Sequence, residues 1–488
     1  MNERISSMAT FAFDAIAARS RGMFNVSSWM YVMGLNVALQ APFWILKNFY
    51  SFQRPIFNED LMLAVLLFSI GLRLGWLVLA AVLVVDVVRI ASLNYHFLNV
   101  ADFVGSVRFV SMMNLAPFLT WAALLLAVMG VLYLFALAQM LKRWRAPMAV
   151  IQVVLIAGVL LADGMNGSMQ MAGIGRDNLR EPFNVGGSPV WNLYKMQQAG
   201  VPSQASGLQV VPSHVRDSIL QWHASQPSGS ILLVLVESMG EPVSPQLRDW
   251  LARQIQSPRL RQRWRFTAGT ERFYGSTTHG ELRVLCGLDG SYEMLDATNS
   301  HPCLPHQLGA DEFTAMGYHG FQLSMFDRNR WWGVAGLQAH HFDYQRSPAQ
   351  VKDCHAVFHG ICDREVLHTA IASVQKPRRL AYVVTLDTHL PLSSRSKLQA
   401  PELAALCVQA DVSEASCALT DQLGALLRDM ANQLEESAAT PYVAVVGDHA
   451  PPFIRTTDRQ AFLTQEIPYL LLEPQDESQQ RSTAAEAP

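Results

Sequence analysis

The chain has 488 residues, of which half belong to the apolar set and only 16% are charged. That balance is too apolar for an ordinary soluble enzyme of this length, so a membrane protein is the first class to consider. Basic residues number 37 and acidic residues 40, for a net charge of −3, and no basic stripe or tail is present. We therefore set nucleic-acid-binding proteins aside as a class.

The first third of the chain contains five apolar runs separated by basic residues, at 29–46, 61–72, 74–88, 115–141 and 148–162. About 20 apolar residues cross a bilayer as a helix. The two runs on either side of Arg73 are short, so 60–88 forms either two tight crossings or one long tilted helix. Five crossings place Arg73 and the basic cluster at 142–145 in the cytoplasm and the rest of the chain outside. Four crossings would leave the rest of the chain inside.

All six cysteines lie in the second half of the chain and fall into three closely spaced pairs. Nearest-neighbour pairing is the simplest choice and joins Cys286 to Cys303, Cys354 to Cys362, and Cys407 to Cys417. Such short-loop disulfides persist only in an oxidising compartment. The alternative is six free thiols in a cytosolic domain. The cysteines thus favour an extracytoplasmic second half, in agreement with five crossings.

From Ile231 onward, short β-rich runs alternate with helical stretches. The runs are ILLVLV, FQLSM, AYVVTL, YVAVV and YLLL, and the helices are expected at 245–256 and 419–435. This alternation predicts a mainly parallel, doubly wound α/β sheet. We expect an α-helical transmembrane bundle at 1–163, a juxtamembrane linker at 164–228 with a short helix at 215–223, an extracytoplasmic α/β domain at 229–474, and a disordered tail at 475–488.

Residues able to bind metal follow three of the predicted strands. Glu237 follows ILLVLV, His389 lies in the DTHLPL segment after AYVVTL, and Asp448 and His449 follow YVAVV. Taken singly, each has a simpler interpretation as a helix cap or a satisfied polar residue. Together they would meet at one edge of the sheet, just beyond the carboxyl ends of the strands. Carboxylates and imidazoles suit a dication such as Zn²⁺ or Mn²⁺, so a metal site is predicted there.

A candidate nucleophile lies in the segment GSTTHGELRVLC, where a turn precedes a helical pattern at 279–288. A hydroxyl group at a helix N-terminus meets free backbone N–H groups and the positive end of the helix dipole. A metal bound to that oxygen would lower its pKa and make it a competent nucleophile. Thr277 and Thr278 are both suitably placed, and an ordinary N-cap is the simpler interpretation.

The order VES-x-G, GST-T-x-x-E, THLP and GDHAP resembles the lipoteichoic acid synthase and phosphoethanolamine transferase branch of the alkaline phosphatase superfamily, a sulfatase-like group. The resemblance covers roughly 231–474 and implies an alkaline-phosphatase-like catalytic domain. It implies that Glu237, Thr277, Asp448 and His449 bind one catalytic metal, with zinc favoured and manganese possible. It also implies that His389 contacts the substrate phosphate or a second metal.

The same resemblance implies a transfer that proceeds through a phosphorylated threonine. The diacylglycerol of the donor lipid leaves first, and an acceptor hydroxyl then takes the phosphoryl group. The spacing of Gly275, Thr277 and Glu281 resembles that of the lipoteichoic acid synthases and favours Thr277 as the nucleophile, with Thr278 as the alternative.

The head group and the acceptor are less sharply defined. Cys303 in CLP and Cys362 in GICD look like the phosphoethanolamine transferases, although GELRVLC departs from their usual S-x-P-C segment. We expect transfer of phosphoethanolamine from phosphatidylethanolamine to an envelope glycan or lipid, in the periplasm, by an enzyme of the bacterial inner membrane. Alternatives are a phosphoglycerol transferase acting on a glucan or a teichoic-acid-like polymer, a phosphodiesterase or phosphatase, and a non-enzymatic subunit for export of an envelope polymer.

The segment FDRNRWWGVAGL follows the run FQLSM and is expected near the same edge of the sheet. Arginine presents a fork that matches phosphate oxygens, and an indole ring can hold an ammonium group. Arg328, Arg330 and Trp331 are therefore predicted to bind the substrate. The alternative is a packed aromatic corner with solvated arginines.

Overall fold

The structure is a computed structural model. It describes residues 26–49, 55–70, 74–94, 105–112, 130, 146–165, 186–188, 190–191, 208–309, 313–342, 354, 357–358, 360–392 and 400–475. The chain forms two compact units, one from residues 1–93 and 118–200 and the other from residues 94–117 and 201–488.

The first unit is helical. Its described elements are α2 (Val26–Phe49), β1 (Phe57–Asn58), α3 (Glu59–Ser69), α4 (Leu74–Asn94), α7 (Ala146–Met165) and β2 (Gly186–Gly187). Four of the five predicted apolar runs are therefore helical, with α3 and α4 dividing the stretch 60–88 between them. The run at 115–141 lies outside the described residues, apart from Gly130. In the described part of the chain, every helix falls short of the length and apolarity that crossing a membrane requires.

The helices of the first unit pack through a small core and a buried pair of amide side chains. Leucines of α2 and α3 meet Phe43 and Val82 in that core. Asn36 on α2 and Gln152 on α7 exchange amide hydrogen bonds of 2.8 and 3.1 Å. Because both amides are buried, each satisfies the polar groups of the other, which fixes how α2 and α7 pack together.

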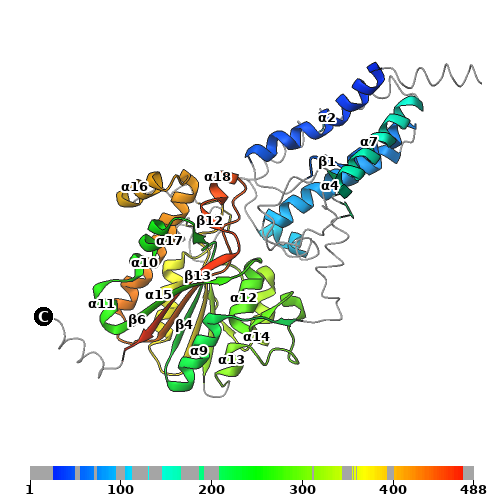
Figure 1. The fold of residues 1–488 in the computed structure, drawn as a ribbon. Coiled ribbons are helices and arrows are strands. Elements are labelled where there is room, and N and C mark those ends of the chain that lie inside the picture. The colour runs from blue at the N-terminus through cyan, green and yellow to red at the C-terminus, as the bar shows by residue number, and fades with distance from the viewer. Residues whose placement is uncertain are drawn as a thin grey trace, which may run out of the picture. The chain divides into compact units, whose positions relative to one another are not determined.

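The second unit is built on a seven-stranded sheet, with the order β6-β13-β11-β4-β10-β8-β9 (Figure 1). The strands are β4 (Ile231–Val236), β6 (Trp264–Arg272), β8 (Thr314–His319), β9 (Gln338–Ala339), β10 (Arg379–Val384), β11 (Tyr442–Gly447) and β13 (Glu466–Pro474). The five strands from β11 to β9 are mutually parallel, whereas β13 pairs antiparallel with both β11 and β6. The predicted mainly parallel sheet is thus confirmed at its centre, and it is mixed toward one edge.

Helices cover both faces of this sheet (Figure 1). One face carries α10 (Pro245–Ile255), α15 (Asp363–Ser373) and α17 (Glu414–Glu436), and the other carries α9 (His214–Ser225), α12 (Thr277–Cys286) and α14 (Arg328–Val334). Successive residues of β4 point to opposite faces, so Leu232 and Val234 join the first core while Ile231 and Leu233 join the second. A strand covered on both sides explains the unbroken apolar run ILLVLV.

Several other elements complete the second unit. They are η1 (Val107–Met112), β3 (Gln209–Val210), β5 (Glu241–Pro242), α11 (Pro258–Arg263), β7 (Leu288–Asp289), η3 (Tyr292–Met294), α13 (Leu304–Gln307), η4 (Met325–Asp327), α16 (Pro401–Gln409), α18 (Thr456–Arg459) and β12 (Phe462–Leu463). Two differ from the predicted division of the chain. Helix α9, predicted within a linker, packs against the sheet, and η1, predicted within the anchor, is tied by Arg108 to Glu293 and Asp327.

The run FQLSM is not a strand, which corrects the sequence prediction. The strand is β8, which ends at His319, and the apolar run after it forms a turn leading into η4. Phe321 and Leu323 are buried there, so their apolar character reflects packing at a corner and not a place in the sheet. The chain turns at Gly320, where a Cβ atom would lie 2.3 Å from the carbonyl oxygen of Ile361.

The three predicted disulfides are confirmed. Cys286 at the end of α12 joins Cys303 before α13, Cys354 joins Cys362 directly before α15, and Cys407 on α16 joins Cys417 on α17. Each bond closes a short loop next to a helix end, and together they fix helices on both faces of the sheet.

Candidate metal centre

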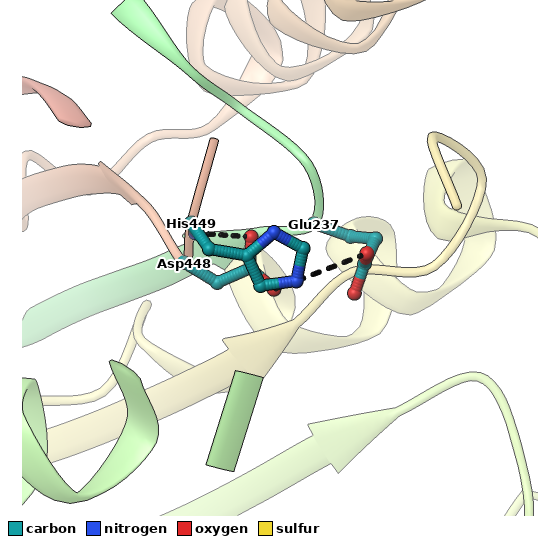
Figure 2. A group of neighbouring side chains, drawn as sticks. All are labelled: Glu237, Asp448 and His449. Atoms are coloured by element: carbon teal, nitrogen blue, oxygen red, sulfur yellow. Dashed lines mark hydrogen bonds and ion pairs between the residues drawn. The ribbon is translucent and has the colours of Figure 1, made fainter. Parts of the chain in front are cut away.

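The register of the sheet brings the predicted metal ligands together. Strands β4 and β11 are parallel neighbours in which Val236 lies opposite Gly447. The next residues along each strand, Glu237 and Asp448, must therefore leave the sheet side by side, and His449 follows. Figure 2 shows these three side chains converging. Their ligand atoms all lie within 4.8 Å of one another.

Thr277 completes the group from the other side. It is the first residue of α12, and Ser276 is the N-cap. The Thr277 hydroxyl donates to Asp448 Oδ2 at 2.8 Å and lies 3.3 Å from both Glu237 Oε2 and His449 Nε2. One hydroxyl oxygen thus faces three potential metal ligands, and the predicted role of Thr277 as ligand and nucleophile stays a prediction.

Each of the three ligand side chains has its other polar atom already engaged. Asp448 Oδ1 accepts the backbone N–H groups of Ser238 and His449 at 2.8 and 2.6 Å. Glu237 Oε1 accepts the Ser238 hydroxyl at 2.8 Å. His449 Nδ1 lies 2.9 Å from the carbonyl oxygen of Ala450, and because a carbonyl only accepts, Nδ1 carries the proton. The atoms left facing Thr277 are two carboxylate oxygens and Nε2 of His449.

Small residues allow α12 to approach this close to β11. At Gly280, on the first turns of the helix, a Cβ atom would lie 2.9 Å from the backbone oxygen of Asp448. At Gly447, it would lie 2.0 Å from the backbone oxygen of Met239. Neither position has room for a side chain. Gly280 therefore lets α12 lie against Asp448, and Gly447 lets the end of β11 lie against the turn that follows β4.

The alternative nucleophile, Thr278, lies differently. It is buried, and its Oγ1 lies 3.2 Å from the hydroxyl of Ser276. Ser276 in turn contacts Nδ1 of His279 at 2.9 Å. Thr278 therefore belongs to the hydroxyl and imidazole network at the start of α12, whereas Thr277 faces the carboxylates.

The charges at the centre favour a bound cation. Burial raises the pKa of Asp448, and the nearby carboxylate of Glu237 raises it further. Burial also acts to raise the pKa of Glu237, but His389 and His449 reverse this and lower it. Two carboxylates this close and this buried repel each other unless one of them takes up a proton or a cation lies between them. The donor set of carboxylate, imidazole and hydroxyl groups fits Zn²⁺ or Mn²⁺ in that role.

His389 lies in the loop after β10, beside this centre. Its ring packs edge to face against Phe358, with 4.7 Å between ring centroids. Burial lowers the pKa of His389, the charge of Glu237 raises it, and His449 lowers it. His389 is close enough to Glu237 and His449 for their charges to interact, and its contact with a phosphate or a second metal stays a prediction.

The loop that carries His389 is fixed by an aspartate that the sequence analysis did not single out. Asp363, at the start of α15, accepts the backbone N–H of Leu386 with both oxygens, at 2.9 and 2.8 Å, and that of Asp387 at 2.7 Å. In the same loop, the Thr388 hydroxyl donates to the backbone oxygen of Glu237. The available signal was the position of Asp363, directly after a disulfide cysteine at the start of a helical pattern.

The predicted substrate-binding residues of FDRNRWW lie mostly in the core. Arg328 is buried and donates to Glu281 Oε1 from Nε at 2.9 Å and from Nη2 at 2.7 Å. The other oxygen of Glu281 accepts the indole N–H of Trp332 at 3.0 Å. Trp331 is fully buried and donates to the backbone oxygen of Phe326. The two tryptophans form the packed aromatic corner that was the alternative raised from the sequence, but Arg328 is buried in an ion pair and not solvated as that alternative expected.

Arg330 differs from its neighbours, because its side chain is exposed. Of the three residues predicted to bind the substrate in this segment, it alone is exposed in the described structure. The other two, Arg328 and Trp331, are buried and contribute to packing of the domain.

The chain matches no family model and no curated protein. Several solved structures are similar to it. A lipoteichoic acid synthase, LtaP from Listeria monocytogenes, has 14% identity and a TM-score of 0.36, and the match covers 51% of this chain and 66% of that one, just under two thirds. The C-terminal periplasmic domain of EptC from Escherichia coli, in complex with Zn, has 14% identity, coverages of 52% and 75%, and a TM-score of 0.32.

A third similar structure extends over most of the chain. It is the integral membrane protein lipooligosaccharide phosphoethanolamine transferase A, EptA, from Neisseria meningitidis, with 12% identity, coverages of 93% of this chain and 88% of that one, and a TM-score of 0.41. These proteins are of the kind that the four motifs resemble, the phosphoethanolamine transferases and lipoteichoic acid synthases.

Proposed function

We propose that the chain is a metal-dependent transferase that moves a phospholipid head group, with phosphoethanolamine favoured, onto an envelope glycan or lipid through a phosphorylated Thr277. One observation carries the proposal. The Thr277 hydroxyl, at a helix N-terminus, lies within 3.3 Å of a ligand atom of each of Glu237, Asp448 and His449. A simple helix cap would not need three buried ionisable groups around its hydroxyl.

In the proposed reaction, Thr277 Oγ attacks the phosphorus of the donor lipid, and the bond from phosphorus to the diacylglycerol oxygen breaks. The proton from the Thr277 hydroxyl is transferred to the diacylglycerol oxygen, and diacylglycerol leaves as the free alcohol. An acceptor hydroxyl then attacks the phosphorus of the phosphothreonine, and Thr277 Oγ leaves and regains its proton. A metal held by Glu237, Asp448 and His449 supplies positive charge that lowers the pKa of the threonine hydroxyl.

The protein itself supplies position and charge at each stage. The N-terminus of α12 directs backbone N–H groups and its positive dipole end toward the phosphate oxygens. Asp448 Oδ2, 2.8 Å from Thr277 Oγ1, holds the hydroxyl in one orientation. His389 is assigned to the phosphate, and the exposed Arg330 remains a candidate for the head group.

We place the reaction at the outer face of a bacterial inner membrane, with the catalytic domain in the periplasm. Three disulfides support an oxidising compartment. Helices of the first unit also present large apolar side chains outward, among them Val26 at 70%, Leu77 at 69% and Leu161 at 67% exposure. Such an apolar exterior suits lipid, where the phosphatidylethanolamine donor resides. Protease protection of the full chain in oriented membrane vesicles tests this placement.

The decisive experiment supplies the purified full chain with zinc and phosphatidylethanolamine carrying a labelled head group. We expect labelled phosphothreonine at Thr277 together with one equivalent of diacylglycerol, and release of the label when an acceptor glycan is added. Labelled phosphatidylglycerol tests the phosphoglycerol alternative in parallel. Free ethanolamine phosphate with no label retained on protein or glycan would instead indicate a phosphodiesterase, and a full chain with neither metal nor label would favour a non-enzymatic export subunit.

A further inference from the structure

Ser238, directly after the ligand Glu237, holds a backbone conformation that serine rarely adopts. Its φ is 55°, in the left-handed region that favours glycine, and its side chain is fully buried. A conformation of this kind persists only where the surroundings determine it strongly, and such residues gather at functional sites. The reason for a serine here therefore lies in what its polar groups contact.

Both polar groups of Ser238 bind metal-ligand carboxylates. Its backbone N–H donates to Asp448 Oδ1 at 2.8 Å, and its hydroxyl donates to Glu237 Oε1 at 2.8 Å. The left-handed turn aims the N–H across to β11 while the side chain reaches back to the preceding residue. One residue thus fixes the rotation of two carboxylates that come from different strands.

The hydroxyl has a specific effect on Glu237. With Oε1 accepting from Ser238, Oε2 is the oxygen that contacts Thr277, at 3.3 Å, while Oε1 lies 3.7 Å from His449 Nε2. The Oε1 oxygen has one lone pair fewer for a cation once it accepts this hydrogen bond, which favours binding through Oε2. Four-coordinate zinc accepts a single oxygen from a carboxylate, whereas larger cations with higher coordination numbers readily take both.

We propose that Ser238 is a positioning residue whose hydroxyl holds Glu237 to one metal-facing oxygen and thereby makes the centre prefer zinc over larger dications. The inference rests on the proposed function only in requiring a metal at this centre. It assigns to Ser238 a role in affinity and selectivity and none in the chemical steps.

Two substitutions separate the hydroxyl from the backbone conformation. Ser238→Ala removes the hydroxyl and keeps a side chain at the unfavourable φ. Ser238→Gly also removes the hydroxyl, but glycine adopts this φ without strain. Both keep the backbone N–H that binds Asp448. Ser416→Ala is the matched control, because Ser416 is also fully buried and donates its hydroxyl to a single acceptor, the backbone oxygen of Asp458, at 2.7 Å.

The experiment measures zinc and manganese affinities of the metal-free full chain and its variants by competition with a chelator, with thermal melting to check folding. We expect both Ser238 variants to lose roughly 10- to 100-fold in zinc affinity, as when other residues that orient metal ligands are removed. Manganese affinity should fall less, so the ratio of zinc affinity to manganese affinity should decrease. Ser416→Ala should melt earlier and bind zinc as the wild type does.

Wild-type zinc affinity in both Ser238 variants would overturn the inference and leave the proposed function standing. A loss in Ser238→Ala that Ser238→Gly restores would also overturn it, since the backbone and not the hydroxyl would then be responsible. Should Ser238→Ala fail to fold, the glycine variant alone decides. Failure of the wild type itself to bind any divalent metal would refute the proposed function.

Discussion

Each of Glu237, Asp448 and His449 has one polar atom bound by the protein and another within 3.3 Å of the Thr277 hydroxyl. In the proposed function these three side chains act as a single unit, because each would fix one direction of coordination. His389 lies beside the unit in a separate loop, held by Asp363. At the scale of residues, the proposed metal ligands and the proposed phosphate contact therefore lie on separate segments of the chain.

The first prediction tests that separation by alanine substitution. Glu237→Ala, Asp448→Ala and His449→Ala should each lose the metal and nearly all transfer activity. His389→Ala should keep the metal and lose activity, because a residue that meets the phosphate mainly stabilises charge in the transition state. Metal content by mass spectrometry, measured with activity, checks this. Stoichiometric metal in the Asp448→Ala protein would show that the site is misplaced, and loss of metal in His389→Ala would make that histidine a ligand.

The second prediction concerns the nucleophile. Thr277→Ala should abolish transfer while most of the metal affinity remains, because Glu237, Asp448 and His449 stay in place. Thr278→Ala should retain activity, since Thr278 Oγ1 contacts Ser276 and not the carboxylates. Mass spectrometry of the protein after reaction with the donor lipid locates the phosphorylated residue. An active Thr277→Ala protein paired with an inactive Thr278→Ala protein would move the nucleophile by one residue.

At the scale of elements, the position of α12 depends on its contact with the end of β11. The third prediction is that Gly280→Ala displaces the helix, because its Cβ atom would lie 2.9 Å from the backbone oxygen of Asp448. Overpacking of this kind lowers the free energy of unfolding by about 1–3 kcal/mol. We expect most of the variant to stay folded and its transfer rate to fall, because Thr277 moves with the helix. Gly333→Ala on α14 is the control, since an added Cβ there meets nothing within 4 Å. Thermal melting and transfer rates of the two variants distinguish them, and equal activity would show that α12 tolerates the shift.

The elements that the sequence predicted well are those whose burial leaves a plain pattern. Strands β4, β10 and β11 are buried on both faces, so their runs are continuously apolar and their ends mark Glu237, the His389 loop and Asp448. Strand β6 was missed because it lies at the edge of the sheet and exposes polar residues along most of its length. The run FQLSM misled for the opposite reason, since its apolar residues pack at a corner after β8. Ser238 and Asp363 were missed because their partners, Glu237 and Asp448 for the serine and the loop at 386–387 for the aspartate, meet them only in the folded chain.

At the scale of the whole molecule, the three disulfides fix helices that the sheet alone would not hold. The fourth prediction is that the Cys286–Cys303 bond stabilises the fold most, because its sequence separation of 17 exceeds the separations of 8 and 10 for the other two. Removing a disulfide costs about 2–5 kcal/mol in small secreted domains, with the cost rising with loop length in the chain-entropy account. Melting temperatures of the three paired Cys→Ser variants under non-reducing conditions test the order. Peptide mapping that found six free thiols would contradict both the pairing and the periplasmic location.

The buried ion pair between Glu281 and Arg328 links the first turns of α12 to the corner that follows β8. Removing one member of such a pair leaves an uncompensated charge in the core, at a cost of about 3–5 kcal/mol, whereas replacing both by apolar residues can be neutral. Such a double replacement is hard to reach by successive mutations, because substitution of either residue alone gives a protein too unstable to be retained. Among descendants of this sequence, positions 281 and 328 should therefore be inherited as one unit, unchanged together or exchanged together.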